Sequence, residues 1–119
     1  MRSHLYQKGW LSMIARVWTG WTETADASAY EEYMHQVALP GYEGVDGNQG
    51  VLMLRRDDAD SGRTEFTMLS LWTSMDSIRA FAGDDPSVAV FYDRDDDFLV
   101  EREETARHYV VYGATGLAA

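Results

Sequence analysis

The sequence predicts an α+β domain of the ferredoxin-like class, with the element order β-α-β-β-α-β. Four short segments are rich in β-branched and aromatic residues, and two stretches repeat apolar residues at helical spacing. A polar turn joins the two middle strand-like segments into a hairpin, which gives the split β-α-β order. The chain has 119 residues, 45% of them hydrophobic, which is enough for one domain with a modest core.

The first half of the chain predicts one strand and one helix. Residues 14–21 (IARVWTGW) are rich in β-formers and predict the first strand. Thr24 can cap a helix over about residues 25–38, and we expect Pro40 and Gly41 to end it. The apolar stripe of this helix comprises Ala27, Tyr30, Tyr33, Met34 and Val37.

Residues 41–50 (GYEGVDGNQG) contain four glycines, a density that invites comparison with phosphate-binding loops. Those loops follow a strand and open a helix, and one version ends in Gly-Lys-Ser/Thr. This segment follows a predicted helix, precedes a predicted strand and lacks that ending. We therefore interpret it as a flexible connector.

A hairpin and a second helix follow. Residues 50–56 (GVLMLRR) and 64–72 (TEFTMLSLW) predict two strands on either side of the polar turn. Ser74 is placed to cap a helix that ends at Gly83. The inward side chains expected for this helix are Met75, Ile78, Phe81 and Ala82.

Residues 84–104 hold nine acidic side chains and two arginines. This segment therefore carries most of the chain's net negative charge. Within this segment, residues 86–93 predict a short helix. Residues 93–104 place carboxylates at the ligand positions of an EF-hand calcium loop, but Phe98 stands where the sharp turn needs glycine. We therefore expect a solvated acidic surface and no metal site. Residues 106–113 (ARHYVVYG) predict the last strand.

The composition excludes several classes of function. The formal net charge of −10 repels phosphate backbones, so we expect no nucleic-acid partner. The chain has no cysteine, which fits a reducing cytoplasm, and no segment predicts a signal peptide or a membrane span. We expect residues 1–12 to be an N-terminal extension, residues 13–113 the domain, and residues 114–119 a C-terminal tail.

Both faces of the predicted sheet are apolar. In the third strand Phe66 and Met68 point to one face, whereas Leu69 and Leu71 point to the other, because alternate side chains lie on opposite sides. Two helices cover only one face of a four-stranded sheet, and soluble monomers rarely expose an apolar patch of that size. We therefore expect a homodimer in which two identical sheets pack face to face.

Several segments resemble the antibiotic biosynthesis monooxygenase domain family. They are MIARVWTGWT, the LPGYEG junction, GVLMLRR, EFTMLSLWTSMDSIRAFAG and RHYVVYG. The likeness covers about residues 13–113 and is strongest around Trp72. It implies a dimeric α/β-barrel with a pocket in each subunit between sheet and helices. Activities in this family range from cofactor-free oxygenation of polyketide quinone precursors to heme degradation.

The heme-degrading branch of that family has an Asn on the first strand, a Trp in the second helix and a His further along. By ungapped spacing, those places hold Val17, Phe81 and Phe91 in this chain. The resemblance therefore disfavours heme degradation.

We expect a monooxygenase that needs no cofactor and acts on a small aromatic or polyketide-type substrate. Oxygenation without metal or flavin needs a substrate that forms an electron-rich anion, a dry pocket, one base and one or two fixed donors. A non-catalytic dimeric module that binds a small ligand is one alternative, and an isomerase or dehydratase on the same fold is another. No sequence feature separates the three.

Four aromatic residues are candidates for the substrate-binding wall. We expect Trp18 and Trp72 at the mouth of the pocket and Phe91 with Tyr92 as a lid. The alternative for each is a place in the core or the dimer interface, because buried aromatic residues usually serve packing.

Three charged or titratable residues are candidates for the chemistry. His108, on the last predicted strand, and His35, near the end of the first helix, are candidate bases because histidine titrates near neutral pH. A structural role is the alternative, above all for His35 at a helix C-terminus. Arg16, inside an apolar strand, either orients an anionic substrate or pairs with Glu65.

Overall fold

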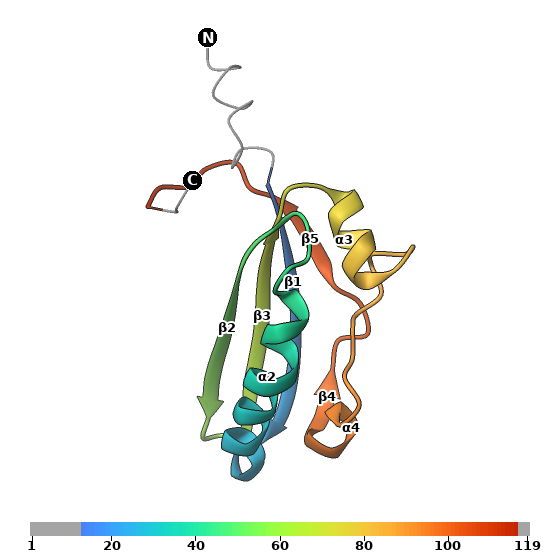
Figure 1. Ribbon diagram of the computed structural model, residues 1–119. Coiled ribbons are helices and arrows are strands. Elements are labelled where there is room, and N and C mark those ends of the chain that lie inside the picture. Colours follow the sequence, from blue (N-terminus) through green and yellow to red (C-terminus); the bar gives the residue numbers. More distant parts are fainter. Residues whose placement is uncertain (1–12, 117–119) are drawn as a thin grey trace.

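The computed structural model describes residues 13–116, which form one antiparallel sheet of five strands with helices against one face (Figure 1). The predicted extension over residues 1–12 and the end of the predicted tail lie outside the described residues. The elements in chain order are β1 (Ile14–Glu23), the 3-10 helix η2 (Thr24–Asp26), α2 (Ala27–Tyr42), β2 (Asn48–Asp58), β3 (Arg63–Trp72), α3 (Met75–Ala82), α4 (Asp95–Phe98), β4 (Leu99–Arg102) and β5 (Arg107–Val110).

The strand order is β2-β3-β1-β4, and β5 also pairs with β1. β1 pairs with β3 along its whole length, from Ile14 opposite Trp72 to Glu23 opposite Arg63. β4 and β5 both run antiparallel to the other edge of β1, so together they occupy the place of one fourth strand. This is the split β-α-β arrangement, and the predicted α+β ferredoxin-like class is confirmed.

Helix α2 differs from its prediction at both ends. It begins at Ala27 after the turn η2, without a side-chain cap from Thr24. It also continues through Pro40 to Tyr42, so the predicted end at Pro40 is wrong. A proline in the last turn removes only one backbone hydrogen bond. The ring of Tyr42 is buried against Trp72 and Phe81, which stabilises the extra turn.

The connector between α2 and β2 is packed at its second half, so the prediction of a flexible connector is wrong there. The N–H of Thr73 donates to the carbonyl of Gly47 over 2.9 Å. Gly47 has φ +89°, and a Cβ at this position would lie 2.4 Å from the Cβ of Ser77. Glycine is therefore required here both for its backbone conformation and for its close approach to α3.

The second half of the chain confirms one prediction and corrects two. Ser74 caps α3 through a capping box with Ser77, and the helix ends before Gly83, as predicted. Residues 86–93 form no helix, and Val88 instead forms an isolated bridge with Thr105, between β4 and β5. The short helix follows them as α4, and the strand predicted over residues 106–113 is shorter, as β5, while residues 99–102 form the additional strand β4.

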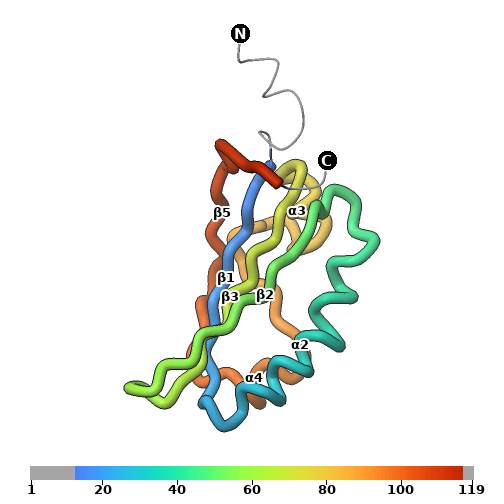
Figure 2. The backbone as a smooth tube through the Cα atoms, turned by 90° about the vertical axis from the view of Figure 1, so that its left-hand side faces the viewer, coloured from blue at the N-terminus to red at the C-terminus, as the bar shows by residue number. Residues whose placement is uncertain are grey.

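Helices α2 and α3 lie on the same side of the sheet, as Figure 2 shows edge-on. The inner face, toward these helices, buries Phe66 and Met68. The outer face carries Leu52 and Leu54, whose side chains are 57% and 47% exposed. The prediction that both faces are apolar is confirmed, and no helix of residues 13–116 covers the outer one.

The core lies between the inner face of the sheet and the helices. Its buried members are mainly aromatic residues, methionines and alanines: Trp18, Ala27, Tyr30, Met34, Ala38, Tyr42, Phe66, Met68, Trp72, Ile78, Ala89 and Ala106. Within the described part of the chain, no helix has the length and apolar character needed to cross a bilayer.

Candidate functional site

Two neighbouring hollows lie between the inner face of the sheet and helix α2. The first is an open groove of about 250 Å³, and the second is an inner pocket of about 20 Å³. Met34 and Met68 line both, so these two side chains form the wall between them. Methionine side chains adapt readily to a new neighbour, and a shift of this wall would join the two hollows.

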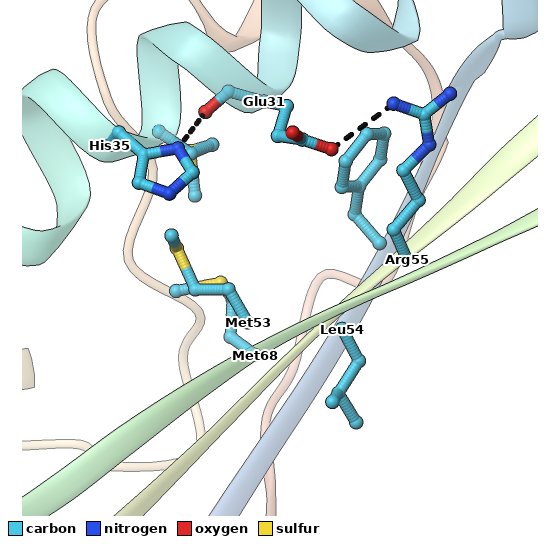
Figure 3. Close-up of a pocket in the computed structure, with 8 residues that line it drawn as sticks. Glu31, His35, Met53, Leu54, Arg55 and Met68 are labelled. Carbon is cyan, nitrogen blue, oxygen red and sulfur yellow. Dashed lines mark hydrogen bonds and ion pairs between the residues drawn. The ribbon is translucent and has the colours of Figure 1, made fainter.

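The groove has an apolar floor and a polar rim (Figure 3). Its lining residues are Glu31, Met34, His35, Met53, Leu54, Arg55, Phe66 and Met68, although the side chain of Leu54 points away from the groove in Figure 3, toward the outer face. On the rim, Arg55 contacts the carboxylate of Glu31 at 3.1 Å. The imidazole of His35 points toward Met53 and Met68, with its Nδ1 2.8 Å from the carbonyl of Glu31.

Arg16 is a buried charged group on the wall of the inner pocket, with only 5% of it exposed. Its guanidinium donates to the carbonyl of Pro86 and, over 2.9 Å, to the carbonyl of Val88. It forms no ion pair with a carboxylate of residues 13–116; Glu65, the partner considered from the sequence, pairs with Arg56 instead. Burial lowers the pKa of Arg16. A buried cation held only by neutral groups favours an anionic ligand.

Two tyrosine side chains share the inner pocket with Arg16. The hydroxyl oxygen of Tyr92 is buried and has no hydrogen-bond partner in the described part of the chain. Burial, and then the nearby charge of Asp95, raise the pKa of Tyr92 to about 12. Burial also raises the pKa of Tyr42. Both phenols therefore keep their protons at neutral pH and are available as hydrogen-bond donors.

Asp95, at the start of α4, also lines the inner pocket. Its carboxylate is 2% exposed and accepts two hydrogen bonds, from the hydroxyl of Tyr30 at 3.1 Å and from the N–H of Tyr92 at 2.7 Å. Burial raises the pKa of Asp95. The sequence placed this residue in a solvated acidic surface, which is wrong for Asp95.

The other carboxylates of the calcium-like pattern point to different partners. Asp97 pairs with Arg94, and Glu101 pairs with Arg63 on β3. Within residues 13–116, no three His, Asp or Glu side chains converge in a way that could hold a metal ion.

Trp18, predicted at the mouth of a substrate pocket, lies on the wall of the inner pocket. Its indole N–H donates to the carbonyl of Glu103 over 2.7 Å, and Gly20 leaves room for the ring, since a Cβ there would come within 2.5 Å of it. Phe91 packs edge-on against Trp18 with ring centres 6.1 Å apart. Phe91 therefore supports the wall, and it is Tyr92 that lines the pocket.

Trp72 lies in the core, lining neither the groove nor the inner pocket. It is 0% exposed, its ring packs against Tyr42 and Phe81, and its N–H donates to the hydroxyl of Ser70 over 2.8 Å. The packing alternative describes this residue better than the pocket-mouth prediction.

The two histidines lie apart. Nε2 of His108 is 3.0 Å from the guanidinium of Arg16, and since arginine has no acceptor, Arg16 is the donor. Burial, and then the charge of Arg16, lower the pKa of His108, which keeps its ring neutral. His108 lines neither hollow, whereas His35 stands on the groove.

The sequence did not predict most of the lining residues, among them Tyr42, Asp95, and Met34 with Met68 as a wall between the hollows. Tyr42 follows Pro40, where the helix was expected to have ended. Asp95 is one of several aspartates in a row, and nothing in that run distinguishes it.

No protein-family model and no curated protein matches the chain. Among the solved structures that match its fold, two each have a TM-score of 0.54 and 14% sequence identity to this chain. One is a Bacillus cereus protein provisionally named an antibiotic biosynthesis monooxygenase, matched over 87% of this chain and 97% of its own. The other, from Chloroflexus aurantiacus, has the same provisional name and is matched over 89% of this chain and 99% of its own. The resemblance stated from the sequence is thus confirmed at the level of the fold.

Proposed function

We propose that this protein is a monooxygenase-like enzyme that needs no cofactor and binds a small aromatic or polyketide-type substrate between the sheet and helix α2. The observation that carries the proposal is the inner pocket itself. A buried arginine without a carboxylate partner in residues 13–116 stands there beside an unpartnered tyrosine hydroxyl. The names of the two structural neighbours agree with this proposal.

The substrate in this proposal is a phenol that binds as its phenolate. The charge of Arg16 stabilises the phenolate oxygen, and the hydroxyl of Tyr92 donates to it. The apolar walls, among them Trp18 and Phe81, exclude water and so strengthen both interactions. These groups act on the anion and leave the neutral phenol less strongly bound, which favours the reactive form.

The electrons for oxygen reduction come from the substrate. A phenolate with a ring C–H opposite its oxygen attacks O₂ at that carbon and forms a peroxide. One oxygen atom remains as a quinone carbonyl, and the other leaves as water with the hydrogens of the phenol and the C–H group. The substrate loses four electrons and O₂ gains four, so no external reductant takes part.

The size of the two hollows defines how such a substrate lies. The inner pocket, at about 20 Å³, has room for about one water molecule and not for an aromatic ring. The ring must therefore displace Met34 and Met68, with its oxygen toward Arg16 and its body in the groove. A substrate with one phenolic oxygen and an apolar body fits this arrangement.

The two histidines have different roles in this proposal. His108 touches Arg16 and lines neither hollow, so it positions the guanidinium. His35, on the groove, is placed to contact the body of the substrate.

A homodimer is part of the proposal. Leu52, Leu54 and Tyr109 are exposed on the outer face of the sheet, where β1 and β3 add half-buried Val17 and Leu69. A second copy of this face would cover these side chains without closing the groove, which lies on the inner side.

Titration with 4-nitrophenol tests the site, because the absorbance of its phenolate reports binding. The parent protein should bind it saturably, and Arg16→Met, which keeps the stem but removes the charge, should weaken binding at least about tenfold. Arg56→Met is the matched control, since Arg56 is exposed near the hairpin turn, and should bind as the parent does. Equal binding by parent and Arg16→Met would refute the proposed site.

Oxygen uptake with a panel of phenols that carry a ring C–H opposite the hydroxyl tests the reaction. The parent should consume one O₂ per quinone formed, and Arg16→Met should lose most of this rate. Tight binding across the panel without oxygen uptake above the protein-free rate would instead show a non-catalytic ligand-binding module.

A further inference from the structure

We propose that Asp95 is the catalytic residue that takes the proton from the substrate's phenolic hydroxyl. This inference rests on the proposed function, because it concerns the same pocket and the same class of substrate. Among the described residues that line the inner pocket, Asp95 is the one with a carboxylate, and none has an imidazole.

The geometry leaves the carboxylate of Asp95 with unused acceptor capacity. Oδ1 accepts from the hydroxyl of Tyr30, and Oδ2 accepts from the N–H of Tyr92. Each carboxylate oxygen has two lone pairs, so each can accept a second proton or hydrogen bond. The two existing bonds fix the orientation of the group at the pocket wall, as a base that must meet a bound substrate requires.

The surroundings of Asp95 adjust its basicity. Burial raises its pKa, which makes it a stronger base than an exposed carboxylate. The groups that face it are Tyr30 from α2, Tyr92 from the preceding segment, Asp96 beside it and Arg102 from β4, with Arg16 of β1 on the same pocket wall. Tyr30, Tyr92 and Arg102 favour the charged form, and burial with Asp96 opposes them.

The two histidines predicted as bases are less well placed. His108 already accepts a hydrogen bond from Arg16, and His35 stands on the groove beyond the methionine wall. Neither lines the inner pocket, where the phenolic oxygen would lie in the proposed function.

The proton step balances. The O–H bond of the phenol breaks, an O–H bond forms on the Asp95 carboxylate, and the negative charge moves to the phenolate beside Arg16. After O₂ has added to the opposite ring carbon, on the groove side, Asp95 releases this proton to water, and the peroxide oxygen that leaves as water takes up one proton from water in the groove. The second hydrogen of that water comes from the ring C–H group.

Proton counting by calorimetry in two buffers of different ionisation enthalpy tests this role. The probe is 4-nitrophenol, studied below its own pKa, where it is free as the phenol. In the parent, the number of protons released per bound phenolate should fall from about one to about zero as the pH rises through the pKa of Asp95. Above that pKa the carboxylate keeps the proton, so none reaches the buffer.

Asp95→Asn should abolish this change and release about one proton at every pH tested. The asparagine can still accept from the N–H of Tyr92 and can donate to the hydroxyl of Tyr30, so the fold should survive. Tyr30→Phe gives a second test, because it removes a hydrogen bond to the charged carboxylate and should move the midpoint to higher pH. Asp97→Asn is the matched control, because Asp97 pairs with Arg94 and is not among the groups that act on the pKa of Asp95; it should keep the transition of the parent.

The outcomes separate the two proposals. An absorbance spectrum showing that the parent binds no phenolate would overturn the proposed function, and the role of Asp95 with it. A bound phenolate whose proton count is the same in parent and Asp95→Asn would overturn the role of Asp95 alone.

Discussion

Replacement of Trp72 by phenylalanine should destabilise the fold while leaving ligand binding intact. The indole is 0% exposed and packs against both Tyr42 and Phe81, and its N–H donates to the hydroxyl of Ser70, which is itself 1% exposed. Phenylalanine keeps an aromatic ring at this place but removes the pyrrole part and the donor.

The expected cost has two parts. The lost volume of about 40 Å³, at about 24 cal/mol per Å³, costs about 1 kcal/mol beyond the lost transfer free energy, and together these reach about 1–2 kcal/mol. The hydroxyl of Ser70 loses its donor in a buried place, which costs about 1 kcal/mol more. A total of about 2–3 kcal/mol should lower the melting temperature of a chain of this size by about 10 °C.

Urea denaturation followed by circular dichroism measures the free energy of unfolding, and 4-nitrophenol binding is measured on the folded variant. Because removing both hydrogen-bond partners costs less than removing one, Ser70→Ala should cost about 1 kcal/mol less in the Trp72→Phe background than in the parent. Trp18→Phe, on the pocket wall, should by contrast weaken binding. A Trp72→Phe variant that is as stable as the parent, or that loses binding while folded, would refute the assignment of Trp72 to the core.

Three further predictions concern the assembly, the pH dependence and the substrate. Sedimentation of the parent should give twice the chain mass of 13.5 kDa, and a monomeric parent would contradict the dimer. Leu52→Glu, on the outer face, should give the monomer, whereas the control Gln36→Glu, on the exposed side of α2, should leave the dimer intact. Because the pKa of His108 is lowered, the folded state binds fewer protons than the unfolded chain, and the free energy of unfolding should fall as the pH drops below about 6.5. His108→Gln should flatten that fall in urea titrations, and equal slopes would show that another group causes it. Hemin with a reductant should show no loss of its absorption band above the protein-free rate, and specific loss would show that the spacing argument was wrong.

The order of the elements could be predicted from the sequence, because alternation along the strands and the caps of α3 are local signals. The end of α2 and the path of residues 86–93 could not, since both depend on tertiary packing. Tyr42 stabilises a turn beyond Pro40. The backbone of residues 86–93 bonds to Glu104, Ala106 and Arg16 and does not form a helix.

Only part of the candidate site could be predicted. Alternation along β1 places Arg16 and Trp18 on the same face, and both do line the inner pocket. Val17, compared with the heme-degrading pattern, belongs to the opposite face, because it pairs with Leu69. Asp95 could not be found, since its burial follows from a contact with Tyr30, 65 positions earlier in the chain.

The pKa of bound 4-nitrophenol, measured from its absorbance across a pH series, tests most directly whether the buried charge of Arg16 holds an anionic oxygen between the sheet and α2. In the parent protein we expect the bound probe to have a pKa at least about one unit below that of the free probe, and we expect Arg16→Met to abolish this decrease. A bound pKa equal to or above the free value in the parent, or the same decrease in Arg16→Met, would contradict this role of Arg16.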